Sequence, residues 1–452
     1  MKNLCKIIFL CLVYFINAEA QPVTWQRFYG DSQSFEVGYS IVQLPDDGFI
    51  AVGKGPSMRL DKYGNIIWMK NYPINGTGIE KTKDGNFLIG VSKLIKININ
   101  GDTLWTRPGV IGSKIIISND GGFYLCGAKF IDPFLTHPYL GKYDSLGFPE
   151  WEIIYNNNII DWAFNDGIFE GGSNLVLIGN YSDSTYITSN PFIMKTDSMG
   201  NLIWFKGYNS DSLDYYYLDQ IQKNVKGEFI VGGSNNLNCY FMHFSSGGLL
   251  KRISYIDSNT QSVQLHSLIN TIDNGFAFTG YYYHAPNYYV RLVKTDLEGN
   301  ELWRILYGNG FSNIGYCVRQ TTDSGFIIIG NREINIQSDI YIIKTDKTGF
   351  ANPPVYINSN STLIVTDFIL YQNYPNPFNP LTNINFDIPK AVHVQIKVYD
   401  IKGREIQTLV NDFRKAGHYE VQFDGTDLSS GVYIYRIDAG DFVSSKRFVL
   451  LK

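Results

Sequence analysis

One short pattern recurs seven times along the chain: a tight turn, a run of large apolar residues and a closing glycine. The turn is rich in Asp, Asn and Gly, and such residues before an apolar run are typical of a strand entered from a turn. The mean spacing between copies is about 46 residues. The first large apolar residues of the copies are Phe49, Phe87, Phe123, Leu175, Phe229, Phe276 and Phe326.

A second element follows each of the first six copies: a D-x-x-G-N turn between two strand-like runs. Asp caps the backbone of such a turn, and Gly adopts the positive φ that other residues avoid. Calcium binding is the alternative, but the turns lack the alternating oxygen ligands of a calcium loop. Six of the seven tryptophans share one repeat position, which indicates packing between repeats. They are Trp25, Trp68, Trp105, Trp151, Trp204 and Trp303.

Several short strands in repeats of this length are typical of propeller blades. We therefore predict an all-β fold, a seven-bladed β-propeller over residues 21–352. The seventh copy has Pro353 where Trp is expected, and proline cannot donate to a central ladder. Residues 25–30 match residues 303–308 in spacing and type. The N-terminal segment is therefore expected to supply the outer strand of the last blade and to close the ring, which removes an open edge.

The fifth repeat departs from this pattern. Lys251 replaces Trp, Phe244 replaces the turn Asp, and Met242 stands where the other repeats have Lys or Arg. Either this blade packs differently or a partner contacts it.

The N-terminus has the pattern of a secretory signal peptide over residues 1–20. Lys2 and Lys6 precede an apolar run, and Ala18 and Ala20 are the small residues expected before cleavage at Gln21. The run is too short to span a bilayer of about 30 Å, and no later run reaches about 18 apolar residues. The sequence predicts export without transmembrane anchoring.

Charge and cysteine content exclude other classes. Charged residues make up 18% of the chain and the net charge is −4, so no basic face for nucleic acid is expected. Beyond the signal segment, Cys126, Cys239 and Cys317 lie in or beside apolar runs, which predicts free, buried thiols. No cofactor motif is present, and the histidines do not cluster at metal-ligand spacing.

The candidate binding face follows from blade topology. In a four-stranded meander the two kinds of tight turn share one end, so the second connections and the blade-to-blade connections share the other. Connection lengths vary only there, and binding residues concentrate on variable loops. The longer connections are residues 129–139, 181–191, 281–289 and 331–339.

These connections are rich in aromatic side chains, whose flat faces and hydroxyls suit sugar rings or peptides. We therefore predict a glycan or protein ligand, although tyrosines that merely cover loop backbone would give the same pattern. The candidate ligand-binding residues are Tyr139, His137, Tyr186, Tyr216, Tyr282, His284 and Tyr288.

Catalysis is the second hypothesis. A pair of carboxylates could perform acid–base glycoside chemistry, which would make the protein a secreted hydrolase of polysaccharides. No nucleophile or metalloprotease motif supports another reaction. A third alternative is a surface scaffold without a small ligand. The carboxylates on or near the candidate face are Asp132, Asp183, Asp211, Asp214, Glu333 and Asp339.

The composition changes after the repeats. Residues 353–367 are polar and predict a linker, and six alternating segments over residues 368–452 predict a small antiparallel, Ig-like β-sandwich. Residues 371–380 read YQNYPNPFNP, residues 431–436 read GVYIYR, and the chain ends in FVLLK. The most distinctive residues are Tyr374, Pro375, Asn376, Pro377, Phe378, Gly431, Tyr433 and Lys452.

This segment resembles the type A C-terminal sorting domain of type IX secretion cargo. The resemblance implies Sec export, recognition by the outer-membrane type IX machinery, and often removal of the domain during surface attachment or release. The protein is accordingly expected to be secreted or displayed on the outer cell surface. The repeats resemble secreted bacterial propellers, which implies a fold but no ligand.

Overall fold

The computed structural model describes residues 22–452, except residues 31–34, 73–77, 91–92, 109–111, 133–134, 157–159, 183–188, 209–216, 236–237, 257–261, 309–310, 335–336, 359–367, 374–375 and 415–416. The predicted signal peptide lies outside these residues and stays a prediction. The chain divides into two compact units, residues 22–362 and 363–452. All regular secondary structure in the described residues is β-strand.

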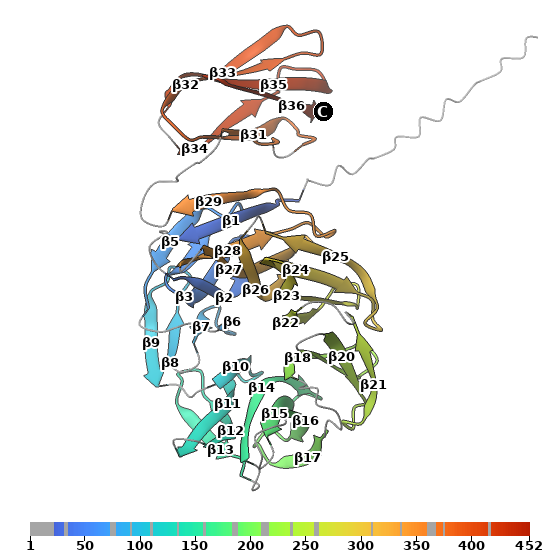
Figure 1. Cartoon of the computed structure of the whole chain (residues 1–452). Helices are drawn as coiled ribbons and strands as arrows, with labels where there is room; N and C mark the ends of the chain where they lie inside the picture. The colour runs from blue at the N-terminus through green and yellow to red at the C-terminus, as the bar shows by residue number, and fades with distance from the viewer. Residues whose placement is uncertain are drawn as a thin grey trace, which may run out of the picture. The chain divides into compact units, whose positions relative to one another are not determined.

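The first unit is a ring of seven antiparallel sheets, the blades of a β-propeller (Figure 1). Blade 1 contains β2 (Val37–Gln43), β3 (Phe49–Lys54), β4 (Ser57–Leu60) and β5 (Ile66–Lys70). Blade 2 contains β6 (Ile79–Lys81), β7 (Phe87–Ile89), β8 (Lys93–Ile97) and β9 (Thr103–Pro108). Blade 3 contains β10 (Gly112–Ile117), β11 (Phe123–Asp132), β12 (Leu135–Tyr143) and β13 (Pro149–Ile154). Blade 4 contains β14 (Ile160–Glu170), β15 (Asn174–Ser182), β16 (Ser189–Thr196) and β17 (Leu202–Gly207).

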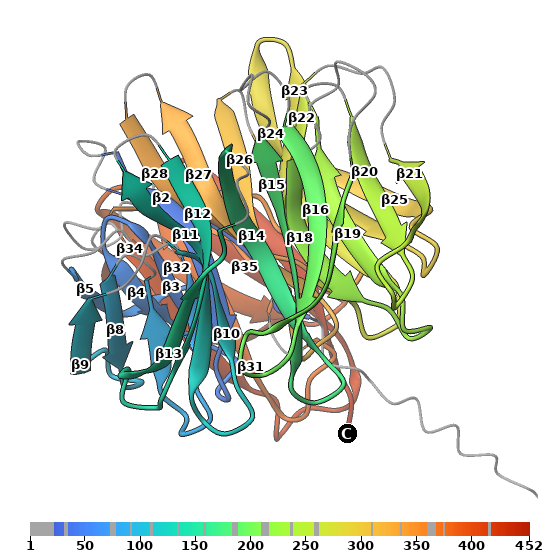
Figure 2. The same cartoon turned by 90° about the horizontal axis from the view of Figure 1, so that it is seen from below.

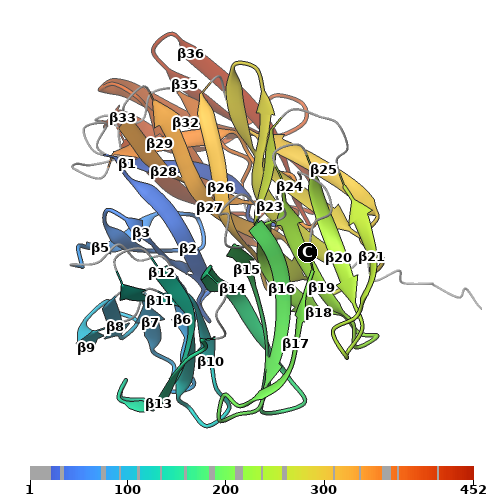
Figure 3. The same ribbon diagram turned by 60° about the horizontal axis from the view of Figure 1, so that its bottom comes forward.

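Blade 5 contains β18 (Tyr217–Lys223), β19 (Phe229–Ser234), β20 (Cys239–Phe244) and β21 (Leu250–Tyr255). Blade 6 contains β22 (Val263–Asn270), β23 (Phe276–His284), β24 (Asn287–Thr295) and β25 (Glu301–Tyr307). Blade 7 contains β26 (Ser312–Gln320), β27 (Phe326–Ile334), β28 (Gln337–Lys344), β1 (Trp25–Gly30) and β29 (Pro354–Asn358). The predicted fold class is confirmed. In each blade the first strand lies nearest the centre of the ring (Figures 1 and 3).

Blade 7 confirms the predicted ring closure and corrects one detail. Strand β1 pairs antiparallel with β28, with Trp25 opposite Lys344. It is not the outermost strand, because β29 pairs with its other edge in parallel. The first residues of the predicted linker therefore belong to the propeller. The residues from position 354 onward pair with this edge and satisfy backbone groups that β1 would otherwise expose.

The repeated turn works as the sequence predicts. In the first copy, Asp61 Oδ1 accepts hydrogen bonds from the backbone N–H groups of Tyr63 and Asn65, each at 2.8 Å. Gly64 has a φ of 83°. Backbone and side-chain hydrogen bonds already occupy the Asp oxygens, since Asn65 also donates to Oδ2 at 2.9 Å.

The repeated tryptophan packs on the turn glycine of the next blade, and a tyrosine four residues later donates to the carbonyl of that glycine. At the closing junction, a Cβ added to Gly64 would lie 3.1 Å from the Trp25 ring, and the Tyr29 hydroxyl lies 2.7 Å from the Gly64 oxygen. We call this Trp–Tyr–Gly arrangement the interblade clasp. The tyrosine–glycine pairs are Tyr29–Gly64, Tyr72–Gly101, Tyr155–Gly200, Tyr208–Gly248 and Tyr307–Gly349.

A basic residue on the third strand of most blades pairs with the acidic residue of the first turn. In blade 1, Arg59 lies 2.7 Å from Asp46. The equivalent pairs are Lys96–Asp84, Lys142–Asp120, Lys195–Glu170, Lys294–Asp273 and Lys344–Asp323. These ion pairs link the third strand to the turn between the first two strands, and they explain the basic residue that recurs at this position.

Blade 5 packs differently, as one of the two sequence interpretations proposed. Met242 replaces the basic residue and is 2% exposed within an apolar cluster. Phe241 takes the place of the missing tryptophan, because a Cβ added to Gly299 of blade 6 would lie 2.8 Å from its ring. The irregular residues of this blade are thus a different solution to the same interblade contact.

The cysteines of the described residues confirm their prediction. Cys126, Cys239 and Cys317 are all buried and none forms a disulfide. Burial raises the pKa of the Cys126 thiol, so this side chain acts as a small apolar residue.

The second unit is a sandwich of two antiparallel sheets. One contains β30 (Ile369–Leu370), β31 (Leu381–Ile388) and β34 (Gly417–Asp424), and the other contains β32 (Val392–Tyr399), β33 (Glu405–Arg414), β35 (Gly431–Ala439) and β36 (Phe442–Leu450). Alternating residues of both sheets form a single core that includes Phe386, Ile396 and Phe448. The predicted segments agree with these strands.

Candidate functional site

The variable connections are mostly strand extensions rather than loops, which corrects our expectation. Strands β23 and β24 stay paired as far as His284 and Asn287, and this hairpin projects at the edge of the ring in Figure 2. Strands β11 and β12, and β27 and β28, extend in the same way. Because cross-strand hydrogen bonds continue to the tips, these extensions present side chains on two defined faces.

The structure places the predicted ligand-binding residues that it describes in different environments, some buried and some exposed. Tyr139 is fully buried, and its hydroxyl is bonded to Glu152 at 2.6 Å. His137 is also buried, beside Trp162, at 7% exposure. These two side chains pack inside the propeller, because the strand pairing turns them toward the neighbouring blade.

The remaining candidates belong to blade 6 or lie beyond the described residues. Tyr282 packs against an apolar cluster shared with blade 5. His284 is exposed at the hairpin end and Tyr288 is partly exposed. Tyr186 and Tyr216 lie outside the described residues.

Six rings from three blades form a continuous row in which each ring contacts the next. Tyr39 of β2 meets Tyr316 of β26 with ring centroids 5.3 Å apart, and Tyr316 stacks on His266 of β22 at 5.0 Å and an angle of 2°. His266 meets Tyr281 at 5.9 Å. Tyr281 then meets Tyr288 at 5.0 Å, and Tyr288 meets Tyr283 at 4.9 Å. We call these six side chains the aromatic track; all are partly exposed.

The inner part of the aromatic track arises from β-bulges. In six of the innermost strands the pairing register shifts by one residue, which leaves an extra residue that the ladder does not pair. The extra residues are Tyr39, Ser113, Asn165, Asp219, His266 and Tyr316, and a second shift in β14 leaves Asp161 as another. No alternation in the sequence marks these positions, which is why sequence reasoning missed them.

Burial disfavours the charged forms of two of the bulged side chains. Burial raises the pKa of Asp219 well above its usual range, and Ser234 Oγ lies 3.3 Å from its carboxyl group. Burial likewise lowers the pKa of His266, whose Nδ1 lies 2.9 Å from the Gly315 carbonyl. The arrangement therefore offers aromatic faces and hydrogen-bonding groups.

Two ion pairs join the innermost strands of the ring. Arg319 of blade 7 reaches Glu80 of blade 2 at 2.7 Å, and Lys114 of blade 3 lies 3.3 Å from Asp166 of blade 4. Asp166 Oδ2 also accepts the backbone N–H of Ile221 in blade 5 at 3.0 Å. Two basic and two acidic groups are thus balanced here, which favours a structural role.

Of the carboxylates proposed for catalysis, the structure describes the side chains of Glu333 and Asp339. Asp339 is 2% exposed, and Glu333 lies 3.5 Å from the Asn331 side-chain nitrogen. Asp183, Asp211 and Asp214 lie outside the described residues. Asp132 lies on β11, at the end paired with Leu135.

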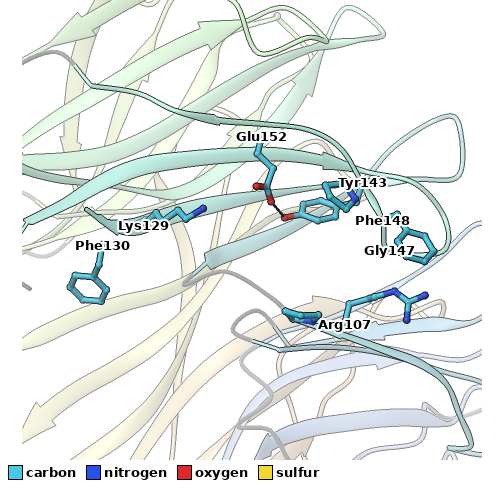
Figure 4. A pocket seen from close by; sticks show the side chains of 10 residues that line it. Arg107, Lys129, Phe130, Tyr143, Gly147, Phe148 and Glu152 are labelled. Atoms are coloured by element: carbon cyan, nitrogen blue, oxygen red, sulfur yellow. Dashed lines mark hydrogen bonds between the residues drawn. The ribbon is translucent and has the colours of Figure 1, made fainter. Parts of the chain in front are cut away.

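A separate cavity of about 630 Å³ lies between blades 2 and 3 (Figure 4). Lys129 and Phe130 from the candidate face reach its rim, and the turn residues Gly147 and Phe148 line another wall. In the part of the chain that the structure describes, no group of three metal-ligating residues occurs, and no helix is long and apolar enough to cross a membrane.

The distinctive residues of the C-terminal unit hold its first segment against its last strand. Asn376 Oδ1 accepts the N–H of Val449 at 2.8 Å, and Phe378 stacks on Phe448 at 5.2 Å. Tyr433 donates to the Ser429 carbonyl at 2.7 Å, and Gly431 begins β35.

The C-terminal lysine extends these contacts. The Lys452 N–H lies 2.9 Å from Ser430 Oγ, and its ammonium group contacts the Thr426 carbonyl. Tyr374 and Pro375 lie outside the described residues, whereas Pro377 immediately precedes the buried Phe378. The motif residues that the structure describes therefore tie segments some seventy residues apart into one sandwich.

Comparison with known families identifies the class of this unit. Residues 372–451 match the secretion system C-terminal sorting domain. The protein is cargo of the type IX secretion system, an exported β-propeller followed by a sorting domain. The sorting domain implies handling by the type IX machinery and export to the cell surface or beyond.

Solved structures similar to the chain include several bacterial proteins. A protein of unknown function from Dyadobacter fermentans is 10% identical, with 72% of this chain and 99% of that chain covered and a TM-score of 0.47. The extracellular domain of a putative hybrid two-component system from B. thetaiotaomicron is 10% identical, with coverages of 94% and 59% and a TM-score of 0.45. PorZ, a surface component of the type IX system of Porphyromonas gingivalis, is 10% identical, with coverages of 92% and 81% and a TM-score of 0.30. No curated protein matches the sequence.

Proposed function

We propose that the exported propeller is a glycan-binding protein and that the aromatic track is its binding surface. The observation that carries this proposal is the run of six contacting, partly exposed rings from Tyr39 to Tyr283. Flat rings bind the apolar faces of sugars, and their hydroxyl groups provide hydrogen bonds at the edges.

The polar surroundings support a sugar rather than a charged ligand. The bulged residues Asn165 and Asp219 lie on the innermost strands of blades 4 and 5, and the ion pairs among these strands balance their charges. Burial raises the pKa of Asp219 and so favours the protonated carboxyl group, which both donates and accepts hydrogen bonds and would suit a hydroxyl group of a glycan.

The predicted route of export fits this role. The N-terminal signal peptide would take the chain across the inner membrane, and the sorting domain would then direct it to the outer surface. A surface or secreted location would expose the aromatic track to polysaccharides outside the cell.

The test is a glycan array probed with the chain from residue 21 to 452, scored for retained protein and for loss of the glycans. Tyr288→Ala is expected to weaken binding of any retained glycan by about tenfold, since it removes a ring from the aromatic track. Tyr255→Ala is the matched control, because Tyr255 is 50% exposed on β21 of blade 5, outside the track.

Each outcome distinguishes the alternatives. Unchanged glycan affinity in Tyr288→Ala and in Tyr316→Ala would contradict this location of the site. Loss of the glycans would instead favour the polysaccharide hydrolase. Absence of any retained protein would contradict glycan binding and favour a protein ligand or a scaffold.

A further inference from the structure

The junction between blades 2 and 3 lacks one part of the interblade clasp. Five junctions have a tyrosine four residues after the repeated tryptophan, but the residue four after Trp105 is Gly109 in the sequence. Trp105 itself keeps its usual contact, because a Cβ added to Gly147 would lie 2.8 Å from its ring. The cavity of about 630 Å³ lies at this junction (Figure 4).

The cavity retains the groups that receive a tyrosine elsewhere. Gly147 lines it, and among the described residues none donates a hydrogen bond to the Gly147 carbonyl. At the next junction, the corresponding Gly200 carbonyl accepts the Tyr155 hydroxyl at 2.7 Å, and the Tyr155 ring meets Phe164 at 5.7 Å. In the cavity, Tyr143 and Phe148 provide aromatic walls.

The cavity also has a cationic side. The Arg107 guanidinium lies 4.3 Å from the Phe148 ring and 5.5 Å from the Trp105 ring, which holds it in place. Its Nη1 donates to the Thr106 carbonyl at 3.0 Å, its Nε is buried without a hydrogen-bond partner, and no carboxylate among the described residues forms an ion pair with it. Lys129 lines the same cavity (Figure 4).

The carboxylate of the cavity is already engaged. Glu152 Oε1 accepts the hydroxyls of Tyr139 at 2.6 Å and Tyr143 at 2.8 Å. The Tyr139 hydrogen bond lowers the pKa of Glu152, so it stays ionised. The positive charges that remain for a ligand are those of Arg107 and Lys129.

We propose that this cavity binds a phenol ring with a carboxylate close to it, as an acidic, tyrosine-bearing segment of a partner protein presents. The ring takes the place of the absent clasp tyrosine, and its hydroxyl donates to the Gly147 carbonyl. The carboxylate pairs with Arg107. The chain thus has a peptide-binding site on the blade 2–blade 3 junction, separate from the aromatic track.

The test is a titration of the chain from residue 21 to 452 with N-acetyl-L-tyrosine, followed by NMR. We expect saturable binding with a dissociation constant of about 1 mM. N-acetyl-L-tyrosinamide, which lacks the carboxylate, and N-acetyl-L-phenylalanine, which lacks the hydroxyl, should each bind about tenfold more weakly. Equal affinity for all three probes, or no saturable binding, would overturn the proposal.

A pair of matched variants locates the site. Arg107→Met keeps a long side chain between the two rings but removes the charge, and should weaken N-acetyl-L-tyrosine by about tenfold. Lys206→Met alters the same position relative to the repeated tryptophan in blade 4, where Tyr208 completes the clasp, and should change nothing. If both variants bound N-acetyl-L-tyrosine with equal affinity, the probe would bind elsewhere and the proposal would be overturned. If a variant does not fold, the comparison of the three probes on the unaltered protein still tests the proposal.

Discussion

The five clasped junctions and the two irregular ones solve the same packing problem with different side chains. At the closing junction, Trp25 is 3% exposed and Tyr29 is fully buried against Gly64. At the blade 5–blade 6 junction, Phe241 and His243 face Gly299 instead. At the blade 2–blade 3 junction, the tyrosine position is left unfilled by the repeat and a cavity lies there.

This difference shows how the repeated residues close the junctions between blades. Where tryptophan, tyrosine and glycine all recur, the junction is closed and its polar groups are satisfied internally. Where one member is missing, either other side chains fill the junction or polar groups of the junction stay available to a ligand. A complete clasp therefore closes its junction, and an incomplete clasp can leave a cavity.

The largest expected effect comes from opening the closing junction. Trp25→Ala should lower the free energy of unfolding by about 3–5 kcal/mol, because it removes a large buried side chain and leaves a cavity. Chemical denaturation of the chain from residue 21 to 452 measures this. Trp105→Ala is the comparison and should cost less, since Trp105 is only partly buried. An unchanged midpoint for Trp25→Ala would contradict the role of β1.

The irregular blade 5 junction should make stability depend on pH. Burial and the nearby Arg252 lower the pKa of His243 to about 4, while Glu228 and Glu298 oppose this change. In the unfolded chain this histidine has its ordinary pKa of 6.5, so its contribution to folding stability is complete above that pH. As the pH falls toward about 4 the unfolded chain binds the proton more readily, and the free energy of unfolding decreases by on the order of 2 kcal/mol.

Thermal unfolding between pH 7 and pH 4 measures this dependence. His243→Gln should flatten it, because glutamine does not titrate, whereas substitution of the exposed His284 by Gln should leave it unchanged. An identical pH dependence in the His243→Gln protein would show that another group causes it.

A smaller effect isolates one hydrogen bond of the clasp. Tyr29→Phe keeps the ring but leaves the Gly64 carbonyl without its donor, and should cost about 1–2 kcal/mol. Tyr217→Phe alters a tyrosine that is 48% exposed on β18 and lies outside the clasp, and its midpoint of denaturation should move less. Equal costs for the two variants would show that the clasp hydrogen bond makes no special contribution to stability.

The sequence predicted the blades because their pattern is local. An Asp that caps its own turn and a glycine with positive φ are set by a few neighbouring residues, as Asp61 and Gly64 illustrate. The similarity of residues 25–30 to residues 303–308 predicted ring closure, and β1 does pair with β28. The same reasoning failed for β29, whose place depends on an edge that β1 presents only after the ring has closed.

The candidate sites were harder to predict from the sequence. Tyr139 is as aromatic as Tyr288, yet Tyr139 is fully buried, whereas Tyr288 contacts two other rings of the aromatic track. His266 and Tyr316 were overlooked because a bulge is not visible in alternation, and stacking between blades joins residues that are distant in the chain.

The sequence by itself predicted a repeated all-β propeller, since turn chemistry and strand alternation act over short distances, and its C-terminal motif residues resemble those of a type IX sorting domain. Only the tertiary structure decided which side chains meet across blades, from the Trp25–Gly64 contact to the cavity lined by Gly147. The physical reason is that burial and contact depend on the register between blades, which no single repeat encodes.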